Sequence, residues 1–216
     1  ELDLLKKYPK IKKNLIKRKE LKSKKNIKIA RTFGKNFFDG ERKYGYGGLK
    51  YNQKYWKNVT KDFIKYYKLN NKSSILDIGC AKGYMLYDFK KALPKLKVTG
   101  IDISKYAIKN SKKEIKNFLK VGDAKKLKFK DNSFDLVIAI NTIHNLNKKE
   151  CGKAIQEIAR VSKKNSYIVL DAYGSDAQKK KMLAWNLTGK TIMHKKDWKL
   201  FMKKNNYKGD YFWFTP

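Results

Sequence analysis

The stretch "ILDIGCAKGY", residues 75–84, decides the fold, because it joins an apolar strand to an amphipathic helix through a glycine-containing turn. The apolar run ends at Ile78, and Gly79 and Gly83 flank the turn. Glycines in this setting let the backbone approach a ligand closely and aim the amides of the following helix at it. The stretch therefore predicts a ligand site at the carboxyl end of the first strand of a sheet.

This turn differs from the loops that bind dinucleotides and nucleoside triphosphates. Ala81 stands in its middle, and Leu86 occupies the position where a dinucleotide-binding loop carries its third glycine. The sequence also contains no GxxxxGK[ST] motif. The pattern thus disfavours nicotinamide or flavin dinucleotides and nucleoside triphosphates as ligands.

Strand-like apolar runs alternate with amphipathic helical patterns along the chain after the first strand, residues 74–78. We expect further strands over 97–103, 119–121, 134–140, 167–170 and 211–214. We expect helices over 59–69, 84–93, 104–118, 148–161, 177–185 and 196–204. This alternation predicts an α/β fold with a three-layer, doubly wound (Rossmann-like), mostly parallel sheet of six or seven strands.

Acidic side chains follow the ends of the next two strands. Asp102 ends the second strand in "VTGIDIS", where a carboxylate can accept hydrogen bonds from both hydroxyls of a ribose. Asp123 follows the third strand in "VGDA", where a carboxylate can accept a hydrogen bond from an exocyclic amine. Polar residues, beginning with Asn141, gather after the fourth strand. A nucleoside-containing ligand that lies across several strand ends fits this order.

These motifs together resemble the class I S-adenosylmethionine-dependent methyltransferases, especially the type 11-like family that modifies small molecules, over about residues 73–173. The resemblance implies S-adenosylmethionine as cofactor, S-adenosylhomocysteine as product, no metal, and a small-molecule acceptor. Carried over position by position, it implies cofactor contacts from Asp77, Gly79, Cys80, Ala81, Gly83, Asp102, Ile103, Asp123, Ala124 and Asn141.

Each contact has a role that the resemblance implies. The loop 79–83 lies against the methionine and ribose portion, and Asp77 supports that loop and the cofactor's amino group. Asp102 binds the ribose hydroxyls, while Ile103 packs on adenine. At the later strand ends, the carboxylate of Asp123 and the amide of residue 124 read the adenine edge, and residue 141 approaches the methionine portion.

Two departures from the family pattern stand out. Ala81 replaces the usual middle glycine and narrows the loop by one methyl group. The family ends its sheet with an antiparallel hairpin, whereas one aromatic strand precedes Pro216 here. The seventh strand is therefore either absent or truncated.

His144 is the candidate catalytic residue. It follows the fourth strand, where acceptors dock in this family, and histidine titrates near neutral pH, as a general base requires. A histidine that holds the loop by hydrogen bonds is the equal alternative. Cys80 and Cys151 are expected to be structural, and no cluster of His or Cys has metal-ligand spacing.

Residues 1–58 are expected to form an appendage to a methyltransferase domain over 59–216. Residues 1–28 are a basic, amphipathic helical arm, and residues 31–56 are rich in glycine and aromatic residues. We call 31–56 the lid segment, because the family folds the corresponding stretch over its cofactor. Its acceptor contacts would come from Tyr44, Tyr46, Tyr51 and Trp56. The alternative is that these rings merely pack the arm onto the domain.

The net charge of +35 permits two interpretations. It favours either a polyanionic partner such as RNA or an anionic lipid surface, or a genome whose base composition enriches lysine; we favour the second. The low cysteine content, the lack of an apolar signal core and the lack of a long apolar run lead us to expect a cytoplasmic protein without a transmembrane segment. A non-catalytic cofactor-binding module is a further alternative.

Overall fold

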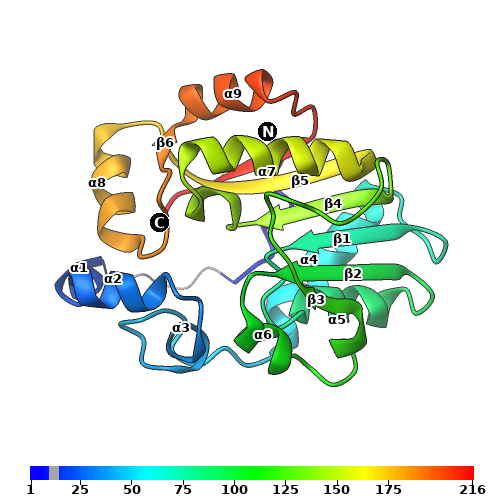
Figure 1. Cartoon of the computed structure of the whole chain (residues 1–216), viewed down its shortest axis with the longest axis horizontal. Helices are drawn as coiled ribbons and strands as arrows, with labels where there is room; N and C mark the ends of the chain where they lie inside the picture. The colour runs from blue at the N-terminus through cyan, green and yellow to red at the C-terminus, as the bar shows by residue number, and fades with distance from the viewer. Residues whose placement is uncertain (10–14) are drawn as a thin grey trace.

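Seven strands form one sheet in the computed structural model, which describes residues 1–9 and 15–216 (Figure 1). They are β1 (Ser74–Ile78), β2 (Lys97–Asp102), β3 (Leu119–Val121), β4 (Phe134–Ile140), β5 (Ser162–Tyr173), β6 (Met193–His194) and β7 (Asp210–Phe214). The spatial order is β3-β2-β1-β4-β5-β6, with β7 also paired to β5. The predicted doubly wound sheet is confirmed.

Every pairing between these strands is parallel in the described part of the chain. The order reverses between β1 and β4, so the crevice for a ligand lies outside the carboxyl ends of these two strands. The last strand, β7, lies parallel to β5 from Tyr167 to Asp171. A seventh strand is therefore present, but the antiparallel hairpin of the family pattern is not found among the described residues.

Helices cover both faces of the sheet (Figure 1). On one face, α4 (Gln53–Tyr66) and α5 (Tyr84–Ala92) enclose a core with Phe63, Leu86 and Phe89. On the other face, α7 (Lys148–Val161) and α9 (Lys195–Lys204) enclose a second core. Apolar strand residues point alternately into the two cores, which is the expected arrangement for a sheet buried on both sides.

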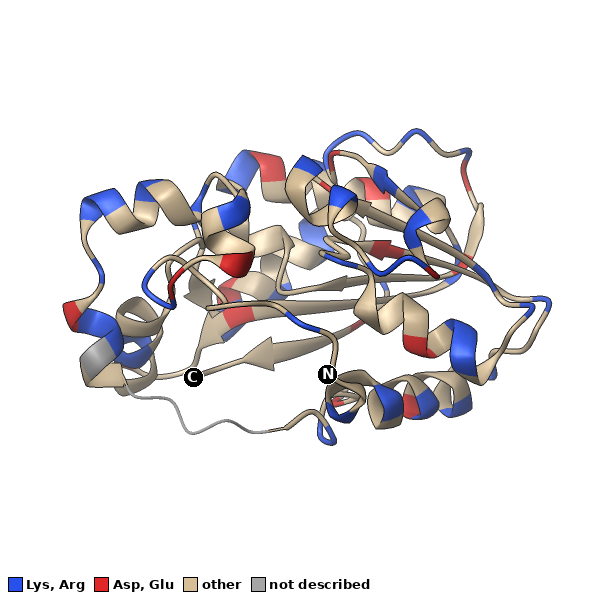
Figure 2. Cartoon of the chain, turned by 90° about the horizontal axis from the view of Figure 1, so that it is seen from below, with Lys and Arg blue, Asp and Glu red and all other residues tan. Residues whose placement is uncertain are grey.

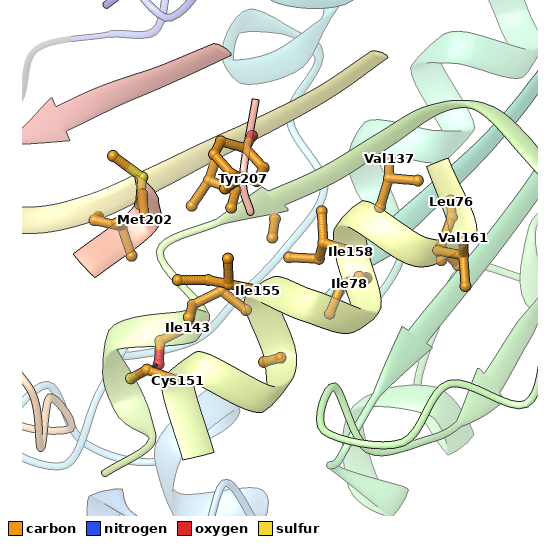
Figure 3. Packing of buried hydrophobic residues seen from close by; sticks show 14 of the residues in the cluster. Leu76, Ile78, Val137, Ile143, Cys151, Ile155, Ile158, Val161, Met202 and Tyr207 are labelled. Atoms are coloured by element: carbon orange, nitrogen blue, oxygen red, sulfur yellow. Dashed lines mark hydrogen bonds between the residues drawn. The ribbon is translucent and has the colours of Figure 1, made fainter. Parts of the chain in front are cut away.

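Helix α7 shows why the sequence folds this way locally. Asn147 caps it in a capping box, since its side chain accepts from the Glu150 amide while the Glu150 carboxylate accepts from the Asn147 amide. Cys151, Ile155 and Ile158 then repeat at helical spacing on one face and are fully buried (Figure 3). This face anchors the loop that leads from β4 to the candidate site.

The remaining helices are short and lie mostly outside the carboxyl ends of the strands. They are α1 (Leu15–Glu20), α2 (Lys24–Ala30), α3 (Lys35–Asp39), α6 (Lys105–Lys109) and α8 (Asp176–Trp185), with two 3₁₀ turns at Lys116–Phe118 and Ile143–Asn145. In Figure 1, α1, α2 and α8 lie beyond the tips of the strand arrows. The N-terminal arm thus reaches the edge of the sheet where ligands bind.

The expectation of one helical arm over residues 1–28 is wrong for its first part. The Leu2 amide donates to the Tyr211 carbonyl at 2.8 Å, and the Tyr167 hydroxyl donates to the Leu2 carbonyl at 2.9 Å. Leu4 is buried in the core beside α4. The spacing of Leu4 from later apolar residues is typical of a helix, but residues 1–9 are non-helical and lie against the domain. Ile11 of that pattern lies outside the described residues.

Two predicted helices have different limits. The helix expected over 59–69 begins at Gln53, because the Asn52 side chain accepts from the Lys54 amide and caps it. The boundary expected at residue 58 therefore falls inside a helix. The helix expected over 104–118 ends at Lys109, where the side chains of Asn110 and Ser111 donate to carbonyls of the helix's last turn.

Lysine and arginine are distributed over most helices and loops in the view of Figure 2, rather than concentrated on one surface. This distribution favours a general enrichment in lysine over a single binding face for a polyanion. No helix in the described residues is long and apolar enough to cross a membrane.

Candidate cofactor and acceptor site

The turn after β1 has the left-handed backbone that its glycines allow. Gly79 and Gly83 have φ values of +79° and +74°. A Cβ atom on Gly79 would stand 2.0 Å from the Thr142 hydroxyl oxygen, so only glycine fits between the loops after β1 and β4. Ala81 has φ +51°. Its methyl group therefore does more than narrow the loop, because an L-residue in this conformation is strained by roughly 1 kcal/mol.

Asp102 links this turn to the end of β2. Its Oδ2 accepts from the Ala81 amide and its Oδ1 from the Ser104 amide, both at 2.8 Å. The carboxylate is buried, and burial raises its pKa while the two amides partly offset that effect. Each oxygen keeps acceptor capacity beyond these bonds, as a carboxylate that binds two ribose hydroxyls needs.

Asp77 lies near Asp102 at the base of the turn and is also buried. Burial, and then the charge of Asp102, raises the pKa of Asp77 from 3.8 to about 7. Two neighbouring buried acids favour a cationic ligand, because a positive charge would stabilise both carboxylates. These two carboxylates thus fit S-adenosylmethionine, which carries a sulfonium and an ammonium beside a ribose.

The other predicted cofactor residues lie along the same edge. Ile103 follows Asp102 and exposes 57% of its surface, as an apolar platform for a base requires. The Asp123 carboxylate is partly exposed and lies 3.5 Å from Lys125 Nζ, and Ala124 packs beside the core. Asn141 is exposed just after β4, with a left-handed φ of +52°. Strand pairing brings all of these positions to one edge.

His144 is held by its own surroundings. Its Nδ1 accepts from the Asp171 amide at 3.1 Å, and its Nε2 lies 3.4 Å from Asp171 Oδ2. The backbone carbonyl of His144 accepts from the amides of Lys190 and Thr191. The side chain is 3% exposed, and burial lowers its pKa. Because the Nδ1 lone pair is occupied and Nε2 faces a carboxylate, this geometry supports the role of holding the loop.

Both cysteines are buried thiols in the described structure. Burial, reinforced by the charges of Asp77 and Asp102, raises the pKa of Cys80 well above its usual value. Burial raises the pKa of Cys151 to about 11, and its Sγ lies 3.1 Å from the Ile143 carbonyl oxygen. Neither thiol has the lowered pKa of a nucleophilic cysteine.

A partly buried ion pair joins the lid segment to the turn after β1. Lys82 is only 6% exposed, and its Nζ lies 2.7 and 2.8 Å from the two carboxylate oxygens of Asp39 and 2.9 Å from the Leu49 carbonyl oxygen. Asp39 also accepts from the Tyr106 hydroxyl at 2.8 Å, and Leu49 accepts from the Tyr84 hydroxyl at 3.0 Å. Sequence reasoning missed this contact, because one lysine among so many gives no signal.

The four predicted lid aromatics lie in different places. Tyr46 stacks on Phe38 with centroids 5.8 Å apart, and burial together with the charge of Asp102 raises its pKa. Tyr46 as a whole is 48% exposed. Tyr44 lies under Lys43, with Nζ 5.0 Å from its ring centroid.

The other two lid aromatics contact the outer helices. Tyr51 donates to Asp88 on α5 at 2.6 Å. Trp56 belongs to α4 and packs edge-on against Tyr8, with centroids 4.9 Å apart. Within the described ranges, no group of three or more His, Cys, Asp or Glu could hold a metal ion.

Comparisons with known proteins agree with this geometry. A family model described as a methyltransferase domain matches residues 69–209. The malonyl-[acyl-carrier protein] O-methyltransferase of Legionella pneumophila is 27% identical over 165 residues, which cover 74% of this chain and 55% of that protein. The human mitochondrial arginine-hydroxylase NDUFAF5 is 32% identical over 103 residues, which cover 47% of this chain and 29% of that protein.

A solved structure shares the fold at low identity. The YcgJ protein of Bacillus subtilis superposes with a TM-score of 0.54 at 20% identity, over 68% of this chain and 66% of that chain. This chain spans about half or less of the curated relatives described above. The family match nevertheless covers most of its residues, including the turn after β1 and the strand ends that follow. The chain therefore belongs to the class I S-adenosylmethionine-dependent methyltransferases.

Proposed function

We propose that the chain transfers the methyl group of S-adenosylmethionine to a small-molecule acceptor by in-line displacement. One observation carries the proposal: the buried acids Asp77 and Asp102 stand together behind a glycine turn at the switch point of the sheet. When bound, the cofactor supplies an electrophilic methyl group on a sulfonium. The relative named as an O-methyltransferase adds support for this reaction class.

The residues of the chain act mainly by positioning in this proposal. Asp102 holds the ribose and Ile103 supports the base, while Asp77 faces the positively charged portion of the cofactor. Asp123 and Asn141 complete the contacts at the ends of β3 and β4. An in-line displacement gains most from a fixed alignment of acceptor and methyl carbon, so these contacts are sufficient as catalytic machinery.

The lid segment closes the acceptor side in this proposal. The Lys82–Asp39 ion pair holds it across the cofactor loop, and Tyr46 lines the methyl path. A closed lid excludes water and strengthens the electrostatic contacts inside. Tyr44, Tyr51 and Trp56 would then support the lid from outside, through their contacts with Lys43, Asp88 and Tyr8 respectively.

The acceptor has to present a lone pair without help from His144. Since the imidazole is engaged with Asp171, we propose that it orients the loop after β4 and removes no proton. A carboxylate, or an amine in its neutral form, meets this requirement, because neither has to lose a proton before it attacks.

Methyl-labelled S-adenosylmethionine, incubated with the purified protein and fractionated metabolite pools, tests the proposal. We expect label to enter a small molecule. Label that enters only RNA or anionic lipid would identify a polyanionic acceptor instead. Cofactor binding with no labelled acceptor would identify a non-catalytic module.

Tyrosine substitutions test the lid. We expect Tyr46→Ala to lower kcat for the labelled acceptor while cofactor affinity stays unchanged. Tyr66→Ala on α4 is the matched control, because Tyr66 is 50% exposed and Tyr46 is 48% exposed. Equal loss of thermal stability in Tyr46→Ala, without a specific effect on kcat, would show that the ring only packs the arm onto the domain.

A further inference from the structure

The arginines of this chain fall into two settings. Arg160 on α7 forms ion pairs with two carboxylates, at 2.6 and 2.7 Å. The other three arginines in the sequence are Arg18, Arg31 and Arg42, all in the arm and the lid segment. Among the described residues, no carboxylate oxygen lies within 4.0 Å of their side-chain nitrogens. In this part of the chain they are cations without an acidic partner.

Arg18 and Arg42 converge on one aromatic ring. Their Cζ atoms lie 5.4 and 5.5 Å from the ring centroid of Trp185 at the end of α8, within the range of cation–π interactions. Arg18 donates from Nη1 to the Arg42 carbonyl at 2.8 Å and from Nε to the Trp185 carbonyl at 3.2 Å. Arg42 donates from Nη1 to the Gly45 carbonyl. These contacts fix both guanidinium groups and leave further N–H donors for a ligand.

This arrangement has an electrostatic cost in the free protein. Burial, and then the charge of Arg42, lowers the pKa of Arg18 to about 10. Burial and the charges of Arg18 and Arg31 likewise lower the pKa of Lys22. Partly buried cations that repel one another are stabilised when an anion binds between them.

The arginines also lie close to the candidate acceptor site. The Arg42 guanidinium donates to the carbonyl of Gly45, which directly precedes Tyr46 in the lid segment. On the other side, the guanidinium of Arg31 donates to the Gly189 carbonyl at 3.0 Å. The next residue, Lys190, donates to the His144 carbonyl after β4. In Figure 1, α1, α2 and α8 lie at the same end of the sheet, beyond the strand tips.

The use of arginine here is informative. Lysine supplies nearly all the positive charge of the chain, yet two of its four arginines lie at the ring of Trp185. A guanidinium presents a planar fork that matches carboxylate and phosphate oxygens bidentately, whereas an ammonium is a point charge. General enrichment in lysine does not explain two arginines at one ring.

We propose that Arg18 and Arg42 bind the anionic group of the acceptor, a carboxylate or a phosphate monoester, on the outer side of Tyr46. This inference rests on the proposed methyltransferase function and names the chemical class of its acceptor. Arg18 is partly buried and Arg42 is exposed. Two guanidinium groups that meet at one ring suit one small anion better than an extended polyanion.

Titration calorimetry with malonate and with inorganic phosphate, each in the presence of saturating S-adenosylhomocysteine, tests the proposal. The wild-type chain should bind at least one of them, and the stronger of the two identifies carboxylate or phosphate. Arg42→Gln should weaken that binding about tenfold or more, as expected for a lost charge-assisted hydrogen bond. Arg18→Lys should also weaken it, because lysine keeps the charge and loses the fork.

Lys163→Gln is the matched control, since Lys163 is exposed at the start of β5, at the opposite edge of the sheet. Lys163→Gln should bind the anion as the wild type does, and Arg18→Lys should keep the wild-type affinity for S-adenosylhomocysteine. Equal anion binding by all variants, or no binding of either anion by the wild type, would overturn the inference. The inference would also be overturned if the arginine variants bound malonate and phosphate as the wild type does and lost only the binding of a short single-stranded RNA. Failure of the wild type to bind S-adenosylhomocysteine would instead reject the proposed function.

Discussion

The carboxyl edge of the sheet and the core beneath α7 differ in how they use burial. At the edge, Asp77 and Asp102 are buried near each other and Ala81 has a left-handed backbone. Beneath α7, Cys151, Ile155 and related apolar residues are fully buried on a helix with a complete capping box. The two buried carboxylates and the left-handed alanine at the edge destabilise the free protein. We expect a bound ligand to compensate for this cost. Burial of apolar side chains in the core offsets the destabilisation at the edge.

The largest effect should come from the edge. Asp102→Ala removes the carboxylate that we propose as the acceptor for two ribose hydroxyls, and hydrogen bonds to a charged group contribute about 1.5–3 kcal/mol each. We expect affinity for S-adenosylhomocysteine to fall about 100-fold or more in titration calorimetry. Asp131→Ala is the control, since Asp131 is an exposed carboxylate paired with Arg160. Unchanged affinity in Asp102→Ala would mean that the ribose binds elsewhere.

A core substitution should have the complementary effect. Ile155→Ala should lower the free energy of unfolding by about 2–5 kcal/mol, because it leaves a cavity between α7 and the sheet. Ile16→Ala is the control at an exposed position and should change it by less than about 0.5 kcal/mol. Denaturant unfolding measures both. If folded Ile155→Ala also lost affinity for S-adenosylhomocysteine, the core would contribute to ligand binding as well as to stability, contrary to our expectation.

The Asp77 carboxyl predicts an unusual pH dependence. Its pKa in the folded protein, about 7, lies above its ordinary value of 3.8, so the folded state holds a proton that the unfolded chain releases. Its contribution to stability is therefore complete below about pH 3.8, falls as pH rises from there through about 7, and changes no further above that.

Asp77→Asn should remove this loss. At pH 8 we expect the variant to be more stable than the wild type by on the order of 2 kcal/mol, with little difference near pH 4. It should also bind S-adenosylmethionine more weakly, because it lacks the carboxylate that we propose faces the cationic portion of the cofactor. Denaturant unfolding at both pH values and calorimetry measure these effects. A variant less stable than the wild type at pH 8 would contradict the account of the edge.

The smallest effect concerns backbone strain in the turn. Ala81→Gly should leave the free energy of unfolding unchanged or raise it by up to about 1 kcal/mol, since glycine adopts the left-handed conformation without steric cost. Ala159→Gly on α7 is the matched control and should lower it by about 1 kcal/mol, because a helix disfavours glycine. Equal destabilisation by both substitutions would show that Ala81 is not strained.

The sequence predicts features that depend on local patterns and misses those that depend on contacts between distant residues. The strands from β1 to β4 and the edge they form follow from short apolar runs and from local turn signals such as Gly79. The Lys82–Asp39 ion pair joins positions far apart in a lysine-rich chain, so no local pattern marks it. The helix expected over 104–118 fails because the Asn110 and Ser111 side chains end it, which periodicity alone does not register.

We propose that the carboxyl ends of β1 and β2 bind S-adenosylmethionine. Titration of the wild-type chain with S-adenosylhomocysteine tests it most directly, because the product binds without turnover. We expect one site per chain with an affinity in the micromolar range, which is lost in Asp102→Ala and kept in Asp131→Ala. No binding up to millimolar concentrations, or equal binding by wild type and Asp102→Ala, would contradict it.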